Sequence, residues 1–411
     1  MRTLKAGQRF GDYELERKLG VGGMAEVWLA HPTVAGHRAA RVVIKRIHEH
    51  LSHEPKMRTL FLDELRLLQR IEHPNVVRLY EGGAIDDDFF MAMEFIDGLD
   101  LHSCLVAHDG PLWPAFCAAV VAQACVGLHF AHELKDLTGQ PLNLVHRDIS
   151  PDNLMIDVEG VVKVLDFGIA RAETTQTTTF SGSRKGKVRY MAPEYLAESL
   201  ENPSTDVYSL GTTLWELVTG QKPFQELNGP SIINAVIGVG LPRADTVRPS
   251  LPRPLVDLIA DATAPARARL KTARQLELRL RDFLALYPPP STAQLGDEVL
   301  LWKRKLASQP RRARAGGALG QLESTEMVAV PSAPARAFDD SSFGPSPVQV
   351  AHQLDATQVD LKTTAEDERT DRVPAPLAPG AERSVELDPE LESLSRRVDP
   401  VARRKKKAPK R

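Results

Sequence analysis

Apolar and polar residues alternate through the first part of the chain with the two-residue period of β-strands. Residues 13–19 alternate in this way, and residues 26–30 and 41–45 are short apolar runs, the second rich in β-branched side chains. These runs predict three strands, with a glycine-rich turn between the first two. Residues 61–68 instead carry leucines at helical spacing, which predicts one helix within this β-rich unit.

The pattern becomes helical farther along the chain. Residues 114–132 form a strongly apolar stretch that predicts a buried helix. Its cysteines and histidines are expected at packing positions: Cys117, Cys125, His129 and His132. Residues 291–308 also show helical spacing of apolar side chains and predict a last helix. Beyond about residue 309 the chain turns to Pro, Ala, Arg and mixed charge, which cannot bury enough surface to fold, so residues 309–411 are predicted to be disordered.

Composition narrows the class of protein. The chain has 411 residues, of which 42% are hydrophobic, and a formal net charge of −2, so neither nucleic-acid binding nor strong acidity is indicated for the whole. Its three cysteines form no pair at metal-binding spacing, which favours a reducing compartment. No apolar run approaches the roughly 20 residues of a membrane span, and no signal-peptide core follows Met1. We therefore expect a soluble, cytoplasmic protein without a transmembrane segment.

The most informative chemistry lies between residues 146 and 168. The run His146-Arg147-Asp148 is followed by Asn153, and a second carboxylate follows at Asp166. Phosphoryl transfer requires such a set on rigid loops, because one carboxylate receives the hydroxyl proton while an amide and another carboxylate hold magnesium. Alone, the tripeptide is a weak signal.

Two features of the β-rich unit supply groups for phosphate. Gly20, Gly22 and Gly23 lie in the turn between two predicted strands, where backbone N–H groups can approach phosphates without side-chain clash. Lys45 lies on the predicted β-branched strand at 41–45, and Glu64 lies on the predicted helix. An ion pair between Lys45 and Glu64 would aim the lysine at the phosphates.

Taken in order, these motifs and Ala192-Pro193-Glu194 resemble the bacterial Hanks-type (eukaryotic-like) serine/threonine protein kinases from residue 13 to about 287. The resemblance implies an α+β, two-lobed protein-kinase fold, with a small β-rich N-lobe carrying one helix, a larger helical C-lobe and a disordered C-terminal tail. The implied divisions are a lead-in at 1–12, the N-lobe at 13–97, the C-lobe at 98–287, a helix at 288–308 and the tail at 309–411.

The resemblance also assigns roles. Asp148 becomes the catalytic base, Lys45 and Glu64 the phosphate-directing pair, and Asn153 and Asp166 the ligands of Mg²⁺, with Mn²⁺ as an alternative ion. Met93 is placed as gatekeeper, the backbone of Glu94 and Ile96 against adenine, and Asp100 against the ribose. The residues implied around ATP are Leu19, Gly20, Gly22, Gly23, Val27, Val43, Lys45, Met93, Glu94, Ile96, Asp100 and Met155.

Further residues are implied to support the site. His146 and Phe167, which precedes Gly168, would stack into a spine between the lobes, and Asp206 would brace the catalytic loop. Glu194 should pair with an arginine, for which Arg269 has the best spacing. Arg147 would grip a phosphate on the activation segment. The candidate phosphate acceptors there are Thr174, Thr175, Thr177, Thr178, Thr179, Ser181 and Ser183, although a threonine-rich loop is also typical of a flexible one.

Two positions depart from the family pattern. Ser150 stands where a lysine usually contacts the γ-phosphate, and Lys187 stands where a threonine usually bonds to the catalytic Asp. In the implied fold these positions face each other across Asp148. We expect Lys187 to supply the cation that Ser150 lacks; the alternative is that it points at solvent. Because both positions usually discriminate serine/threonine from tyrosine kinases, preference for Ser/Thr rests on the resemblance alone.

The tail carries two weaker signals. Thr357 and Thr364 each precede an acid by three residues, a pattern favoured by phosphothreonine-binding forkhead-associated domains. Residues 403–411 are densely basic without interleaved aromatics, which indicates salt-sensitive contact with anionic partners rather than base stacking.

Three functions are compatible with the sequence. An ATP- and magnesium-dependent protein kinase that phosphorylates Ser/Thr hydroxyls and its own activation loop is favoured, because every chemical group except the lysine at position 150 is present. A pseudokinase scaffold with nucleotide-dependent conformation is the alternative. A carrier for the basic tail, binding nucleic acid or a surface, is the third.

Overall fold

The computed structural model describes most of the first 308 residues. The described ranges are 4–22, 25–34, 37, 39–48, 59, 61–62, 65–66, 68–86, 88–136, 138–167 and 187–308. The chain divides into two units, Met1–Ser324 and Thr325–Arg411, and all described residues belong to the first. Some predicted site residues lie outside the described ranges: Gly23, Glu64, Gly168, Thr174, Thr175, Thr177, Thr178, Thr179, Ser181, Ser183, Thr357 and Thr364. The basic run at 403–411 also lies outside them.

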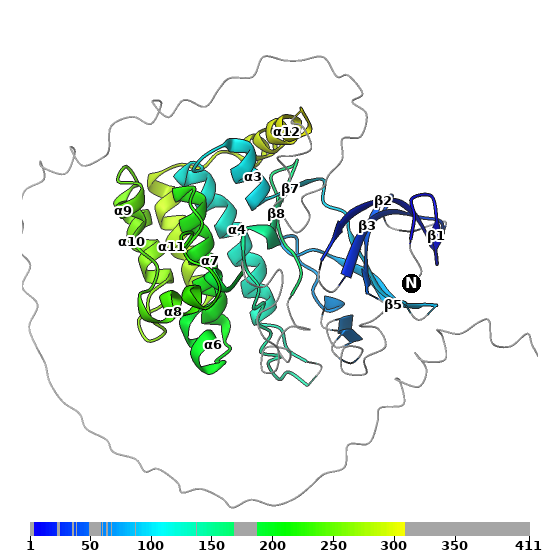
Figure 1. Cartoon of the computed structure of the whole chain (residues 1–411), viewed down its shortest axis with the longest axis horizontal. Helices are drawn as coiled ribbons and strands as arrows, with labels where there is room; N and C mark the ends of the chain where they lie inside the picture. Colours follow the sequence, from blue (N-terminus) through cyan, green and yellow to red (C-terminus); the bar gives the residue numbers. More distant parts are fainter. Residues whose placement is uncertain are drawn as a thin grey trace, which may run out of the picture. The chain divides into compact units, whose positions relative to one another are not determined.

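A six-stranded antiparallel sheet forms the first part of this unit, in the order β1-β2-β3-β4-β6-β5. Figure 1 shows this sheet in blue, apart from the helical part. Its strands are β1 (Arg9–Phe10), β2 (Tyr13–Val21), β3 (Ala25–Pro32), β4 (Val42–Ile47), β5 (Leu79–Ile85) and β6 (Asp88–Glu94). The three predicted strands are confirmed as β2, β3 and β4, each slightly longer or shifted. The described residues 61, 62, 65, 66 and 68 are helical, as their leucine spacing predicted.

The two faces of strand β4 carry side chains with different roles. Val42 and Ile44 are fully buried in a cluster with Trp28 and Phe90. Because successive side chains on a strand point to opposite faces, Val43 and Lys45 share the other face. The sheet thus presents Lys45 on the face away from this cluster.

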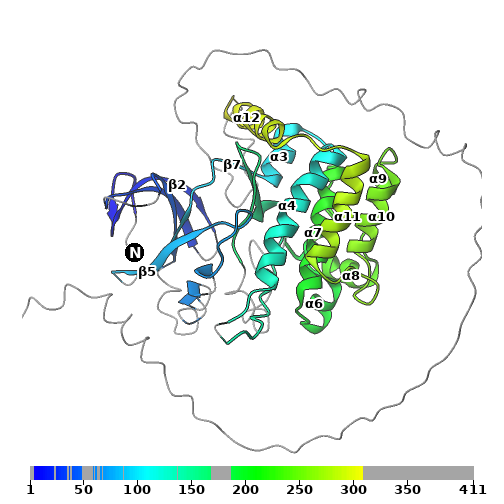
Figure 2. The same cartoon turned by 180° about the vertical axis from the view of Figure 1, so that it is seen from behind.

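The second part of the unit is helical and is built on a small sheet, β7-β8-β9. Its strands are β7 (Gly98–Asp100), β8 (Leu154–Asp157) and β9 (Val162–Val164). Its helices are α3 (Leu101–His108), α4 (Pro114–His132), the 3₁₀ turns η1 (Pro151–Asn153) and η4 (Val188–Tyr190), α6 (Pro193–Glu198), α7 (Pro203–Thr219), α8 (Pro230–Gly238), α9 (Ala244–Val247), α10 (Arg253–Ala262), α11 (Ala273–Leu286) and α12 (Thr292–Ser308). Figure 2 shows the same helices from behind.

Helix α4 is the centre of the helical part. It packs against α11, α7 and β9, and most of its residues are buried, including Cys117 and Cys125. The expectation that no apolar run approaches the length of a membrane span was wrong, because α4 is long and apolar enough to pass as one. However, 72% of its apolar window lies inside the protein, as in a core helix. The helices predicted over 114–132 and 291–308 are therefore confirmed as α4 and α12, with α12 beginning one residue later than expected.

The contact between α4 and the loop before β5 depends on Gly127. A Cβ atom at Gly127 would lie 2.6 Å from the carbonyl oxygen of Asn75, a distance that real Cβ atoms do not tolerate. The Asn75 side chain donates to the carbonyl of Val162 on β9 (2.9 Å), so this loop is also tied to the small sheet. The close approach at Gly127 brings the loop that precedes β5 onto the helical core.

We predict that Gly127→Ala lowers the free energy of unfolding by about 1–3 kcal/mol, because the clash with Asn75 outweighs the better helix propensity of alanine. The matched control is Gly238→Ala at the end of α8, where nothing lies within 4 Å of the added methyl group. This control should be neutral or slightly stabilising. Urea unfolding of both variants checks the prediction, and equal effects at the two positions would contradict it.

Candidate active site

The carboxylate of Asp206 fixes the loop that carries Asp148. Helix α7 begins after Asn202, whose side chain accepts from the N–H of Ser204, and Asp206 lies in its first turn. Asp206 Oδ2 accepts hydrogen bonds from the backbone N–H of His146 (2.8 Å) and Oδ1 accepts from that of Arg147 (2.9 Å). The predicted brace between Asp206 and the catalytic loop is therefore present.

Asp206 keeps its charge although it is fully buried. Burial acts to raise the pKa of its carboxyl, but the hydrogen bond from His132 and the interactions with His146, including its backbone N–H, more than offset this and place the pKa below its ordinary value. His132 Nε2 lies 2.8 Å from Asp206 Oδ2. A charged acceptor thus holds two successive backbone N–H groups of the loop.

The loop conformation that Asp206 stabilises is a strained one. Arg147 adopts φ +66°, in the left-handed region that side-chain-bearing residues seldom occupy. Its guanidinium forms an ion pair with Glu201, in the segment between α6 and α7. Arg147, expected to face a phosphate on the activation segment, thus faces a carboxylate in this structure.

Asn153 and Lys187 both bond to the side chain of Asp148. Its side chain is nearly buried, and Asn153 Nδ2 donates to both its Oδ2 and its backbone carbonyl (2.6 Å each). Lys187 Nζ lies 2.8 Å from the same Oδ2. The structure thus brings Lys187 onto Asp148, as expected from the departure at position 150.

Ser150 lies in the same loop, immediately before η1. It is 1% exposed, and its hydroxyl has no hydrogen-bond partner among the described residues. A buried hydroxyl without a partner is costly unless something else bonds to it. Position 187 therefore provides a cation at the Asp148 carboxylate, and position 150 provides a buried hydroxyl in the same loop as Asp148.

Lys45 and Asp166 join the sheet to the helical part. Lys45 Nζ on β4 donates to Asp166 Oδ1 at 2.9 Å. Asp166 has φ +38°, and the preceding residue is held at both ends: Leu165 N donates to the carbonyl of Asn153 (2.9 Å), and its carbonyl accepts from His146 Nε2 (2.6 Å). The segments that carry Asp148, Asn153 and Asp166 are therefore hydrogen-bonded to one another.

His146 serves this junction as a neutral ring. It is fully buried, which lowers its pKa below the ordinary value even though Asp206 lies nearby. Nε2 donates to Leu165, and Nδ1 accepts from the N–H of Asp148 (3.3 Å), a pattern that a neutral imidazole satisfies. Its ring also contacts that of Phe167 at 4.7 Å between centroids, so the expected contact of these two residues is present, with the ring planes tilted by 47° rather than stacked in parallel.

The oxygen atoms in this site suit a magnesium ion. Asn153 uses its amide nitrogen on Asp148, which leaves its amide oxygen as the group available to a metal, and Asp166 offers a carboxylate. Hard oxygen ligands of this kind are those that Mg²⁺ prefers. Within the described residues no group of three or more His, Cys, Asp or Glu side chains is placed to hold a metal ion.

The residues expected around adenine lie on neighbouring strands. Val43 pairs with Met93 across β4 and β6, and Asp100 pairs with Met155 across β7 and β8. Leu19, Met93, Ile96 and Met155 are buried, whereas Val27 and Val43 are half-buried. Gly20 lies in β2 opposite Val27, and Gly22 N donates to the carbonyl of Ala25 (2.8 Å).

Two acidic residues of the segment between the sheets are already engaged. Glu94 accepts from Lys163 Nζ (2.8 and 2.9 Å) and from the N–H of Arg78 (3.1 Å). Asp100 caps α3, accepting from both the N–H (2.7 Å) and the hydroxyl (3.0 Å) of Ser103. Burial raises the pKa of Asp100 to about 6. Its capping role was not foreseen, and contact with a ribose stays a prediction.

Two buried contacts support the segment after Lys187. Arg269 forms the predicted pair with Glu194, with Nη2 3.0 Å from Oε2, and its guanidinium also lies 4.9 Å from the ring centre of Tyr208. Tyr190, in η4, donates its hydroxyl to Glu216 on α7. Burial raises the pKa of Glu216 to about 7. Both contacts tie the chain after Lys187 to α7 and its neighbours.

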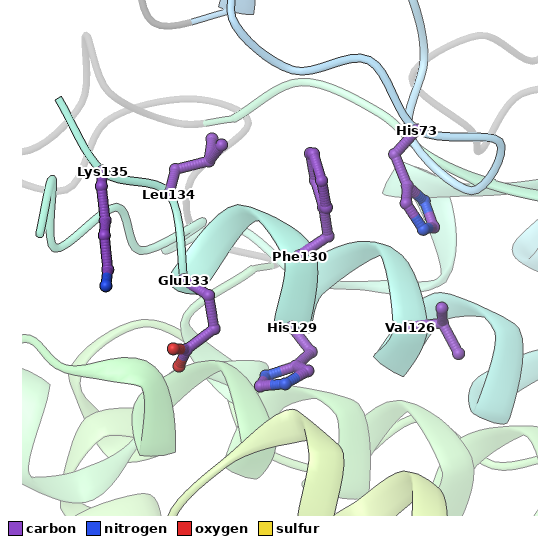
Figure 3. Close-up of a pocket in the computed structure, with 7 residues that line it drawn as sticks. All are labelled: His73, Val126, His129, Phe130, Glu133, Leu134 and Lys135. Atoms are coloured by element: carbon purple, nitrogen blue, oxygen red, sulfur yellow. The ribbon is translucent and has the colours of Figure 1, made fainter. Parts of the chain in front are cut away.

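A separate hollow of about 530 Å³ lies beside the end of α4 (Figure 3). It is lined by His73, Val126, His129, Phe130, Glu133, Leu134 and Lys135. None of the predicted site residues lines it. The His73 and Phe130 rings stack at 5.0 Å between centroids, so this region is an apolar contact between α4 and the loop before β5.

The structure reveals partners that the sequence reasoning missed. His132 was interpreted only as a packing residue, yet it bonds to Asp206; a polar side chain at the end of a buried helix needs a partner, and that was the available signal. Glu201 and Lys163 gave no recognisable pattern, because their partners lie 54 and 69 positions away in sequence.

Comparison with known proteins places these motifs in one family. The model of the protein kinase domain matches residues 13–270. A tyrosine-protein kinase, MasK of Myxococcus xanthus, is 39% identical over 284 residues, covering 68% of this chain and 44% of MasK. The serine/threonine-protein kinases PknE of Mycobacterium bovis and PrkC of Bacillus subtilis are 34% and 33% identical, covering 70% and 66% of this chain and 52% and 40% of their own lengths. The chain thus spans about half the length of these relatives or less.

A solved structure agrees in fold. The kinase domain of PknI from Mycobacterium tuberculosis superposes with a TM-score of 0.52 at 23% identity, covering 68% of this chain and 99% of that domain. At this identity the likeness bears on the fold alone. It confirms the predicted two-lobed architecture, a β-rich lobe followed by a helical one.

We predict that Glu216 makes stability depend on pH. Its folded-state pKa of about 7 lies above the ordinary 4.5, so its contribution is fully present below about pH 4.5 and is lost as pH rises through 7. The variant Glu216→Gln keeps an acceptor for Tyr190 but cannot ionise. The melting temperature of wild type relative to this variant should therefore fall between pH 4.5 and 7.5. A constant difference across that range would contradict the prediction.

Proposed function

Because the chain belongs to the protein kinase domain family, we propose that it is an ATP- and magnesium-dependent protein kinase that transfers the γ-phosphoryl group to Ser/Thr hydroxyls. The observation that supports this most strongly is the 2.9 Å ion pair between Lys45 and Asp166. Leu165, which precedes Asp166, is hydrogen-bonded to Asn153, in the loop that also carries Asp148. These are the groups that phosphoryl transfer needs. They come from both lobes and meet at one place.

Each residue has one physical task in this proposal. Asp148 accepts the proton of the incoming hydroxyl and orients it, held in place by Asn153 and, through the backbone, by Asp206. Lys45 binds phosphate oxygens, and Asn153 and Asp166 hold the magnesium ion. Bound Mg-ATP supplies the phosphoryl group and the metal charge that neutralises it.

The remaining assignments rest on position. Met93, Glu94, Ile96 and Met155 would enclose adenine, with Leu19, Val27 and Val43. A partner role of Glu64 toward Lys45 also belongs to the proposal. The pseudokinase alternative draws only on the absent lysine at position 150.

The acceptor residue has two candidates. PknE and PrkC are named serine/threonine kinases, which favours Ser/Thr. MasK, with 39% identity, is named a tyrosine kinase, and this is the specific observation in favour of a second candidate, tyrosine. The two positions that usually separate these classes, 150 and 187, both depart from the family pattern.

We also propose that Lys187 performs the task of the missing lysine. Its ammonium lies 2.8 Å from Asp148, so it is placed to stabilise negative charge on a phosphoryl group approaching that carboxylate. The hydroxyl of Ser150, which has no hydrogen-bond partner within the described ranges, would replace the threonine of the activation segment. In this proposal the ammonium group and the hydroxyl group have exchanged sequence positions, and both remain available for the reaction at Asp148.

Regulation and partners extend the proposal. Autophosphorylation between residues 174 and 183 would add charge that competes with Glu201 for Arg147. Phosphothreonines at 357 and 364 would bind a forkhead-associated domain, and the basic end would contact anionic partners. The protein would act in the cytoplasm on protein substrates.

Transfer of phosphate from Mg-ATP tests the roles of Asp148 and Lys45. Incubation with Mg-ATP should label the wild-type protein or a generic acceptor, and Asp148→Asn and Lys45→Met should each lower the rate by about 10²-fold or more. Mass spectrometry of the labelled protein then identifies the acceptors. Phosphate on Ser/Thr supports the proposal, and phosphate on tyrosine alone supports the second candidate.

A fully folded wild type that shows a nucleotide-induced rise in melting temperature but no transfer with Mg²⁺ or Mn²⁺ would instead establish the pseudokinase alternative. Activity retained in Asp148→Asn would show that the site is wrongly assigned.

Variants at positions 187 and 150 test the proposed role of Lys187. Lys187→Ala should lower kcat by about 10²-fold or more, because a charge that stabilises the transferred group is lost. Lys187→Thr should be similarly impaired, and adding Ser150→Lys should restore most of the rate, since the usual arrangement is then rebuilt. Steady-state kinetics of the three variants decide the matter. Full turnover in Lys187→Ala would refute the role of Lys187.

A further inference from the structure

Helix α12 lies beyond residues 13–270, the part matched by the family model, yet it packs against the connection between the two lobes. Its neighbours are α3, β7 and β8. Figures 1 and 2 both show α12 beside α3 at the end of the helical part. Strands β7 and β8 carry Asp100 and Met155, so α12 borders the strands expected to enclose the nucleotide.

The buried face of α12 packs closely against its neighbours. Leu295, Val299 and Trp302 are 0–3% exposed. The Trp302 ring stacks on Trp113 at 6.2 Å between centroids and meets Phe116 edge-on at 5.4 Å. Burial of a tryptophan among aromatic rings fixes both the position and the rotation of the helix.

One turn of α12 also touches backbone directly. A Cβ atom at Gly296 would lie 2.2 Å from the carbonyl oxygen of Val158, in the turn that joins β8 and β9. The N–H of Val158 donates to the carbonyl of Asp97 (2.9 Å). Helix α12 therefore contacts Val158, whose N–H is hydrogen-bonded to the backbone of Asp97.

The side chain of Asp97 is held by α12 as well. Lys303 Nζ forms an ion pair with Asp97 Oδ1. At the other end of the same connection, Lys163 pairs with Glu94. The short segment between Glu94 and Asp97, which includes Ile96, is thus anchored by one lysine at each end.

We propose that α12 is a brace for this connecting segment and that Lys303 is a positioning residue for nucleotide binding. This inference rests on the proposed function, in which the backbone of Ile96 contacts adenine. Lys303 does not reach the reacting atoms. By holding Asp97, it keeps the neighbouring backbone in the conformation that receives the base.

This role predicts a particular kinetic signature. Adenine is remote from the transferred phosphoryl group, so loss of its positioning weakens binding of ground state and transition state alike. The KM for ATP then rises while kcat stays unchanged. A merely structural role of α12 would lower the melting temperature and the amount of active enzyme without this separation.

The test is made on the full chain by charge reversal. Lys303→Glu places a carboxylate beside Asp97 and should raise the KM for ATP by about 3- to 10-fold, with kcat within about 2-fold of wild type. Asp97→Lys should behave similarly, and the double variant should return the KM to within about 2-fold of wild type because the pair is restored in reverse. Arg304→Glu is the matched control: it carries the same charge change on an exposed residue of α12 for which no ion pair is seen among the described residues.

These measurements distinguish failure of the proposed brace from failure of the proposed kinase function. An unchanged KM in an active Lys303→Glu variant, or an equal rise in Arg304→Glu, overturns the brace and leaves the kinase proposal intact. A double variant that stays as impaired as the single variants also overturns it. Wild-type protein that neither transfers phosphate nor gains melting temperature with Mg-ATP would overturn the proposed function together with this inference.

Discussion

The candidate active site depends on one buried carboxylate. Asp206 accepts hydrogen bonds from the backbone of His146 and Arg147 and from the His132 ring, and these bonds keep it ionised inside the helical core. A charge in this position is costly unless every lone pair is engaged, so the interaction is specific to one loop conformation. That conformation includes the left-handed backbone of Arg147 and directs Asp148 toward Asn153 and Lys187.

The exchange at positions 150 and 187 changes what the site requires of the rest of the chain. A lysine at position 150 would belong to the loop that Asp206 fixes. Lys187 instead precedes η4, whose place depends on Tyr190 with Glu216 and, farther on, on Glu194 with Arg269. If Lys187 acts as proposed, the cation reaches Asp148 only when η4, which directly follows Lys187, is docked on α7. Chemistry and the order of the activation segment would then be coupled through one side chain.

The sequence predicted the fold well because its signals were local. Strands β2 to β4, helix α4 and helix α12 follow from hydrophobic spacing, and the order of the motifs supplied the two-lobed architecture. The Glu194–Arg269 pair and the Asp206 brace followed from the resemblance and are present. Their partners could be named because the family places them at fixed positions.

What the sequence did not reveal depends on contacts between distant segments. No local pattern joins Arg147 to Glu201 or Lys303 to Asp97, since 54 and 206 positions separate the members of these pairs. Asp100 was expected to contact a ribose, and the structure shows that it caps helix α3 by accepting from Ser103. The sequence alone did not distinguish these roles, because an acid at this position suits a helix N-cap as well as a ribose contact. Glu64 and the activation-segment hydroxyls lie outside the described residues, so their roles stay predictions.

The most direct test of this account is the phosphoryl-transfer rate of Asp206→Asn at saturating Mg-ATP, measured beside its affinity for the nucleotide. Asparagine offers one acceptor oxygen and places an N–H₂ group against a backbone donor, so the loop should lose its fixed conformation. We expect the rate to fall by about 10²-fold or more while nucleotide binding, which depends on Lys45 and the segment at Ile96, is retained. A variant that transfers phosphate within about twofold of wild type would show that the catalytic loop does not depend on Asp206.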